Sequence, residues 1–135
     1  MESKPIHLNI KSHPRNLARI RKEISNAAAV TNLSEEIISS IILAVDETCS
    51  NIIRHSYKNN PDCRINLTIE LTRESICITI RDNGAEFDIC SAQPRDVTDV
   101  KPGGLGIYII KQVMDNVEYC RTKDGYNQIK LIKKL

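Results

Sequence analysis

Residues 65–84 read INLTIELTRESICITIRDNG, and along this stretch apolar and polar side chains alternate in two runs separated by a short polar segment. A period of two is typical of a β-strand, because successive side chains of a strand point to opposite faces. The polar segment at residues 72–75 fits a turn between two such strands. The stretch therefore predicts a β-hairpin with one buried face, formed by Ile65, Leu67, Ile69, Leu71, Ile76, Ile78 and Ile80.

Asp82 continues the parity of Ile76, Ile78 and Ile80, so it points toward the apolar layer if the strand persists to that residue. A carboxylate in such a place is costly unless it accepts hydrogen bonds. We therefore expect Asp82 to have a partner: a ligand amino group, a protein donor or an ordered water molecule. The alternative is an ordinary turn that Asp82 opens and Gly84 completes.

The segment before the hairpin, residues 34–57, has apolar residues at helical spacing. Ser34, followed by Glu35 and Glu36, is typical of a helix N-cap with acidic residues in the first turn. Glu47 and Asn51 lie about 40° apart around this helix, on the side roughly opposite its apolar stripe. They present a carboxylate and an amide together, unless they simply form a solvated helix face. The stripe consists of Ile38, Ile41, Ile42, Val45, Cys49, Ile52 and Ile53.

Further helices and strands are predicted on both sides of these segments. We expect a strand at residues 6–10, a helix at 14–30 and a long irregular loop at 88–102. Residues 105–114 should form a helix, and 117–121 and 127–132 a second hairpin across Asp124-Gly125. Such a mixture of helices and antiparallel strands indicates an α+β fold with helices on one face of the sheet. The 135 residues suit a single domain, residues 1–135.

The composition argues against several classes of function. The formal net charge is only +2, and Lys and Arg are spread among acidic residues, which disfavours direct nucleic-acid binding. The longest aliphatic stretch, residues 41–45, is far too short to span a bilayer, so we expect a cytoplasmic protein with no membrane association. The five cysteines form no Cys-x-x-Cys pair and are interpreted as reduced thiols. The basic residues of the first helix form either a partner or dimer surface or a solvated face; they are Arg15, Arg19, Arg21 and Lys22.

A glycine-rich segment, Gly103-Gly104-Leu105-Gly106, closes the predicted loop and opens the predicted helix. Bare backbone N–H groups at the positive end of a helix suit a phosphate group. The segment is not a Walker A motif, because no Gly-Lys-Ser/Thr follows it. A flexible hinge before a core helix is the alternative.

Three segments in this order resemble the anti-sigma-factor serine kinases. They are AVDETCSNIIRHSY at residues 44–57, DNGAEFD at 82–88 and GGLGIYII at 103–110. These kinases are stand-alone members of the histidine-kinase-like (GHKL, Bergerat-fold) ATPases. The resemblance implies a two-layer α/β sandwich with a mixed, mostly antiparallel sheet and helices on one face.

The resemblance also implies roles for individual residues. Asn51 corresponds to the Asn that coordinates Mg²⁺ held by the ATP phosphates, and Glu47 to the general base for a serine hydroxyl. Asp82 corresponds to the acceptor of the adenine amino group, and Gly84 to the glycine that lets the base approach. Phe87, in the same segment as Asp82, is a further nucleotide-binding residue by this resemblance. The phosphates would be held by Gly103, Gly104, Leu105 and Gly106, under a mobile lid at residues 89–102.

The function implied by the resemblance is phosphoryl transfer from ATP to a protein serine, giving ADP and phosphoserine. The substrate would be a STAS-domain anti-anti-sigma protein, which competes with a sigma factor or another client protein for this chain. A homodimer is expected by analogy alone, and His55 is expected to pack or to form hydrogen bonds rather than to catalyse. Two alternatives stay open: a non-catalytic ATP-gated protein-binding module, and a structural domain with a degenerate pocket.

Overall fold

The computed structural model describes residues 4–88 and 104–135, with the backbone alone for residues 104–107. Within these ranges a five-stranded sheet has the order β1-β2-β3-β5-β4. Every pairing between these neighbours is antiparallel, so no parallel pair of the expected mixed sheet occurs among the described strands. The strands are β1 (Ile6–Lys11), β2 (Arg64–Leu71), β3 (Ser75–Asp82), β4 (Asn116–Arg121) and β5 (Asn127–Lys134).

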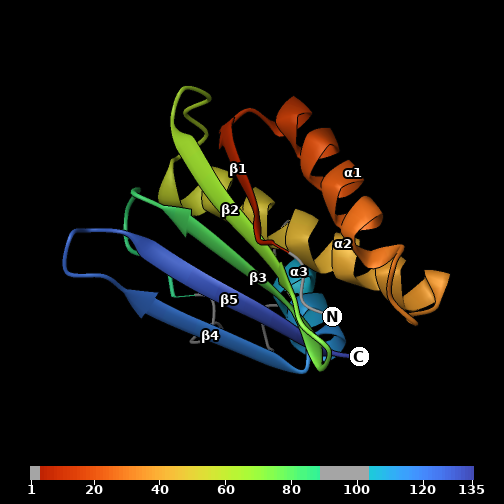
Figure 1. The fold of residues 1–135 in the computed structure, drawn as a ribbon. Helices are drawn as coiled ribbons and strands as arrows, with labels where there is room; N and C mark the ends of the chain where they lie inside the picture. Colours follow the sequence, from red (N-terminus) through yellow and green to blue (C-terminus); the bar gives the residue numbers. More distant parts are fainter. Residues whose placement is uncertain (1–3, 89–103) are drawn as a thin grey trace.

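The helices form a second layer on one face of this sheet, as Figure 1 shows. A short 3-10 segment, Pro14–Asn16, leads into α1 (Leu17–Ala28), while α2 is Glu35–Asn51 and α3 is Gly104–Val113. The two-layer α+β prediction is therefore confirmed, with a helical layer over an antiparallel sheet. No helix in the described ranges has the length and apolar character needed to cross a membrane.

The predicted helix at residues 34–57 begins as expected but changes geometry near its end. The Ser34 side chain accepts a hydrogen bond from the backbone N–H of Ile37 at 3.2 Å, which confirms the N-cap. After Asn51 the chain continues as a π-helical turn, η2 (Ile52–Ser56), closed by a hydrogen bond from the N–H of Tyr57 to the carbonyl of Ile52 at 2.9 Å. Such widened turns are frequent at functional sites.

The hydrophobic core lies between the sheet and the helices. The inward residues of the central hairpin are almost completely buried except for Leu71, which is half-buried at the end of β2. This burial confirms the period-two prediction for the other positions of residues 65–80. The predicted stripe of residues 34–57 is buried at Ile41, Val45, Cys49, Ile52 and Ile53, whereas Ile38 and Ile42 are half-buried. The cysteines within the described ranges are free thiols, namely Cys49, Cys63, Cys77 and Cys120.

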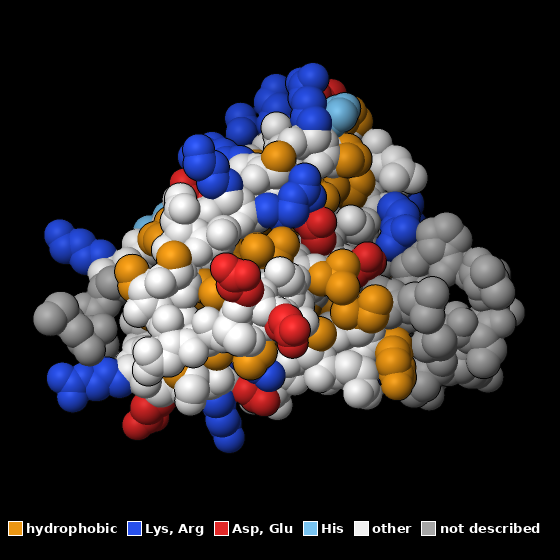
Figure 2. Space-filling model, turned by 90° about the vertical axis from the view of Figure 1, so that its right-hand side faces the viewer, with side chains coloured by type: hydrophobic (Ala, Val, Ile, Leu, Met, Phe, Trp, Pro, Cys, Tyr) orange, Lys and Arg blue, Asp and Glu red, His pale blue; other side chains and the backbone are white. Residues whose placement is uncertain are grey.

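The outer surface of the helical layer carries an uneven charge distribution. Figure 2 shows Lys and Arg side chains gathered at the upper end of this face, with acidic side chains and hydrophobic ones below them. Nη1 of Arg21 on α1 donates to both carboxylate oxygens of Asp46 on α2, at 3.0 and 2.9 Å. This pair ties the first helix to the second at the surface.

Candidate active site

Asp82 is the last residue of β3 and is 1% exposed, as the strand parity predicts. Its Oδ1 atom accepts hydrogen bonds from the backbone N–H of Gly84 at 3.0 Å and from Nδ2 of Asn127 at 2.9 Å. Its Oδ2 atom is also buried, yet it has no hydrogen-bond partner in the described part of the chain. Burial raises the pKa of Asp82, and the hydrogen bonds from Asn127 and Gly84 act against that rise. Thus Oδ1 of Asp82 accepts two hydrogen bonds, whereas Oδ2 accepts none from the described residues.

Gly84 allows the turn after β3 to lie directly against η2. A Cβ atom at this position would stand 2.4 Å from the carbonyl oxygen of Ser56, which is closer than real side chains approach. The N–H of Ala85 donates to the same carbonyl at 2.8 Å. The close approach that the structure shows for Gly84 is therefore to the backbone of Ser56, and its predicted role toward a base stays a prediction.

Tyr57 also stabilises the turn after β3, through hydrogen bonds to Asn83, and the sequence did not indicate this role. Its hydroxyl accepts a hydrogen bond from the N–H of Asn83 at 3.0 Å, and it also contacts Oδ1 of Asn83 and the carbonyl of Arg64. Burial raises the pKa of Tyr57 to about 12, so the phenol stays neutral. The end of α2 and the turn after β3 are thereby held as one unit.

Asn51, at the end of α2, is 1% exposed, so it does not belong to a solvated helix face. Its Oδ1 atom accepts a hydrogen bond from the Arg54 guanidinium at 2.9 Å. Nδ2 of Asn51 and Nε of Arg54 are both buried and have no acceptor among the described residues. Buried donors of this kind need acceptors. Oxygen atoms of an anion such as phosphate supply them.

A magnesium ion fits the Asn51 side chain. An amide oxygen has two lone pairs, so Arg54 leaves one available. Mg²⁺ prefers oxygen ligands and usually takes only one or two from the protein, with phosphates and water completing the set. No cluster of three or more His, Cys, Asp or Glu side chains suited to a metal occurs within the described ranges, which leaves Asn51 as the predicted protein ligand.

Glu47 lies one turn before Asn51 and is half-buried. It forms no hydrogen bond or ion pair with any other described residue. The adjacent carboxylate, Asp46, is by contrast fully engaged with Arg21. Glu47 therefore has no side-chain hydrogen bond or ion pair among the described residues that would explain its carboxylate, and its role as general base stays a prediction.

His55 and Phe87 stack their rings, with centroids 4.7 Å apart and an interplanar angle of 16°. This contact confirms the packing role expected for His55. Burial lowers the pKa of His55, and the neighbouring charges of Arg54 and Lys58 act in the same direction. Phe87 thus belongs to the wall beside η2, while its predicted contact with a nucleotide stays a prediction.

Asn127 is a further site residue that the sequence analysis missed. It opens β5 directly opposite Asp82 in the strand register and is 1% exposed. A signal was present, because Asn127 shares its strand parity with the buried residues Ile129 and Leu131. A buried amide in that series requires partners in the same way as Asp82.

The glycine-rich segment is only partly described. Gly104 begins α3, with Leu105 and Gly106 in the first turn, so the prediction that this segment opens a helix is confirmed. Gly103 and the proposed lid at residues 89–102 lie outside the described residues. The phosphate-binding role of all four residues stays a prediction.

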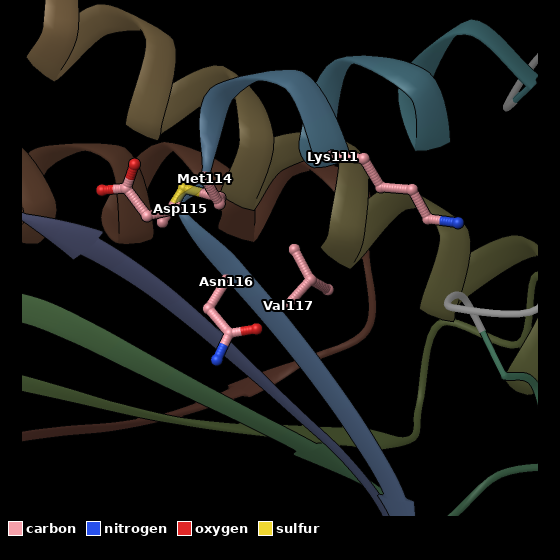
Figure 3. Close-up of a pocket in the computed structure, with 5 residues that line it drawn as sticks. All are labelled: Lys111, Met114, Asp115, Asn116 and Val117. Carbon is pink, nitrogen blue, oxygen red and sulfur yellow. The ribbon is translucent and has the colours of Figure 1, made fainter.

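A surface hollow of about 310 Å³ lies elsewhere, where α3 meets β4. Figure 3 shows that its labelled side chains point in different directions rather than toward a common centre. Asp115 in this hollow is bound by the backbone N–H of Lys134 at 2.6 Å, a bond that lowers its pKa. None of the predicted site residues lines this hollow, so it does not compete with the Asp82 region as the candidate site.

Comparison with known families identifies the family to which the chain belongs. The model of the family described as histidine kinase-like ATPase domain matches residues 10–133. The serine/threonine-protein kinase BtrW of Bordetella bronchiseptica is 32% identical over 96 residues, which are 68% of this chain and 67% of the relative. The serine-protein kinase RsbW of Staphylococcus epidermidis is 28% identical over 139 residues, covering 96% of this chain and 87% of the relative.

Solved structures show the same fold at low sequence identity. A structure of the RsbU and RsbW domains of a Mycobacterium tuberculosis protein has a TM-score of 0.70 at 14% identity, and it covers 98% of this chain and 33% of that chain. The present chain thus spans about one third of that protein. The SiaB-SiaC complex from Pseudomonas aeruginosa also gives a TM-score of 0.70, at 10% identity, covering 94% of this chain and 88% of that one.

Proposed function

Because the chain belongs to the histidine kinase-like ATPase family, we propose that it is an ATP- and Mg²⁺-dependent protein serine kinase that acts by partner switching. The observation that carries the kinase proposal is the Glu47 carboxylate, which lies one helical turn from Asn51 and has no partner within the described ranges. Relatives named serine kinases, including BtrW and RsbW, support the same activity.

Each polar group of the site has a place in this proposal. The Oδ2 atom of Asp82, which has no partner among the described residues, accepts a hydrogen bond from the adenine amino group. The phosphates are bound by Gly103, Gly104, Leu105 and Gly106. The free donors of Asn51 and Arg54 supply further bonds to phosphate oxygens. Mg²⁺, bound by Asn51 and the phosphates, would offset negative charge on the transferred group.

The reaction follows from the position of Glu47. Glu47 accepts the proton of the substrate serine hydroxyl while the serine oxygen forms a bond to the γ-phosphorus. The bond between that phosphorus and the β–γ bridging oxygen breaks, and ADP leaves with its electron pair. The protein contributes mainly position and charge compensation, as is usual for phosphoryl transfer.

We infer a STAS-domain antagonist as the protein substrate and a sigma factor or another client as the competing partner, in the cytoplasm. Homology to proteins named RsbW and the likeness to a two-protein complex support this assignment. A homodimer is compatible with the proposal but rests on analogy.

The decisive experiment incubates the protein with Mg²⁺, γ-labelled ATP and a purified STAS-domain candidate from the same cell. A kinase transfers the label to one serine of the candidate and releases ADP. The alternative, an ATP-gated binding module, holds the same candidate in an ATP-dependent complex but leaves ATP intact. Retention of all label in ATP while the complex forms would therefore contradict the kinase proposal and favour the module.

A further inference from the structure

Asn127 occupies a position where three strands bring their side chains together. In the register it lies opposite Asp82 of β3 and opposite Arg121 of β4. Its side chain is almost fully buried, so its amide must find all its partners within the protein. Two of these partners, Asp82 and Ala85, lie 45 and 42 residues before Asn127 in the chain, so only the folded sheet brings them to it.

The orientation of the Asn127 amide follows from the chemistry of its neighbours. Oδ1 accepts hydrogen bonds from the Tyr119 hydroxyl at 2.8 Å, from the Arg121 guanidinium at 3.1 Å and from the backbone N–H of Phe87 at 3.4 Å. Nδ2 donates to Oδ1 of Asp82 at 2.9 Å and to the carbonyl of Ala85 at 2.8 Å. A guanidinium can only donate and a carbonyl can only accept, so the flipped amide would place donor against donor and acceptor against acceptor. The amide is therefore locked.

The locked amide determines which oxygen of Asp82 remains free. Oδ1 of Asp82 receives both the Asn127 amide and the N–H of Gly84, whereas Oδ2 has no hydrogen-bond partner among the described residues. The Ser56 side chain lies close enough to this carboxyl to act against the rise in its pKa. We propose that Asn127, oriented by Tyr119 and Arg121, is a positioning residue that makes the pocket selective for purines with a 6-amino group over those with a 6-oxo group. This inference rests on the proposed use of ATP.

The physical basis of the selectivity is the acceptor character of Oδ2. A buried carboxylate oxygen without a donor binds an amino group well, whereas the oxygen of a 6-oxo purine would face it as a second acceptor. Burial raises the pKa of Asp82, and the hydrogen bond from Asn127 is the largest of the effects that oppose this rise. Without Asn127 a larger fraction of Asp82 carries a proton, and a protonated carboxyl can donate to a 6-oxo group.

The experiment measures the affinities of ATP and inosine triphosphate by titration calorimetry, because these ligands differ only at the base edge that carries the 6-amino or 6-oxo group, where the 6-oxo purine also has a hydrogen on N1. Asn127→Leu removes the amide at similar volume, and Tyr119→Phe removes only the hydroxyl that orients it. Tyr126→Phe is the matched control, since it removes a phenol oxygen from the same hairpin at a residue outside this hydrogen-bond network.

We expect Asn127→Leu to lower the ratio of ATP to inosine triphosphate affinity about tenfold, the size of one good hydrogen bond. Tyr119→Phe should lower the ratio about threefold, because Arg121 still holds the amide oxygen. The control should leave the ratio unchanged. If Asn127→Leu does not fold, Tyr119→Phe decides the question.

Two outcomes overturn the inference in distinguishable ways. Wild-type protein that binds ATP, together with variants that weaken both nucleotides equally or neither, refutes the positioning role and leaves the proposed kinase function intact. Wild-type protein that binds neither nucleotide refutes the proposed function and the inference with it.

Discussion

Around Asp82 and Asn127 almost every polar atom has a partner. Among the described residues, by contrast, the Glu47 side chain has no partner, and Asn51 and Arg54, where α2 passes into η2, keep unpaired donors. The two regions lie side by side, since η2 packs against the turn after β3 through Ser56 and Gly84. Under the proposed function, the dense hydrogen-bond network would fix the direction of a single recognition group, and the unpaired groups would be left for phosphate, metal and substrate. The contrast would then separate base recognition from reaction chemistry.

The largest effect on activity is expected for a change at Glu47. Glu47→Gln keeps the shape of the side chain and removes its basicity, so phosphoryl transfer to the STAS-domain substrate should fall by about 10²-fold or more. Thermal unfolding should change little, because Glu47 has no partner to lose in the described structure. Transfer of label from ATP and a melting curve on the same sample check both parts. Full transfer by the variant would remove Glu47 from the catalytic role.

The next largest effect, on stability, is expected for a change at Gly84, where the turn after β3 packs against η2. Gly84→Ala places a methyl group against the Ser56 carbonyl, and the resulting displacement of the turn should lower the free energy of unfolding by about 2 kcal/mol. Urea denaturation measures the loss. Gly125→Ala serves as a comparison, because its Cβ meets nothing within 4 Å and only its positive φ of 89° is unfavourable. An equal loss in both variants would show that crowding at Ser56 is not the cause.

A smaller effect with a defined pH dependence is expected for Asp82→Asn. Because the pKa of Asp82 is raised in the folded state, the folded protein binds more protons than the unfolded chain between the unfolded and folded pKa values. The wild-type contribution is therefore most favourable at low pH, and it declines as pH rises through the folded pKa.

The variant lacks this dependence, so its stability relative to wild type should increase with pH across that window while ATP binding is lost. Denaturation curves at several pH values test the trend. A relative stability that decreases with rising pH would mean that hydrogen bonds to the charged carboxylate outweigh its burial.

The smallest effect is expected for Asp46→Asn, which tests the neighbour of Glu47. The ion pair with Arg21 is partly exposed, with side-chain exposures of 44% for Arg21 and 28% for Asp46. Its loss should cost no more than about 0.5 kcal/mol in unfolding free energy. Phosphoryl transfer should stay within about twofold of wild type, far from the loss expected for Glu47→Gln. A large loss of phosphoryl transfer in Asp46→Asn would contradict the proposal that Glu47, and not Asp46, is the general base.

Much of the fold could be predicted because it depends on local patterns. The alternation at residues 65–80 identified the central hairpin, and the Ser34 cap identified the start of α2. Asp82 was placed correctly because a strand has a period of two, so its parity alone indicated burial. The boundary between α2 and η2 was not predicted, because the extra residue in a π-helical turn leaves no mark on the apolar pattern.

The sequence by itself determined the secondary structure apart from the π-helical turn, the buried position of Asp82 and the presence of Glu47 and Asn51 one turn apart on one helix. Each of these depends on residues within a few positions of one another. Only the tertiary structure decided that Asn127 meets Asp82, that Gly84 lies against Ser56 and that Tyr57 holds Asn83. These contacts join residues 26 to 45 positions apart in the chain. They depend on strand register and on helix packing against the sheet, which no local periodicity specifies.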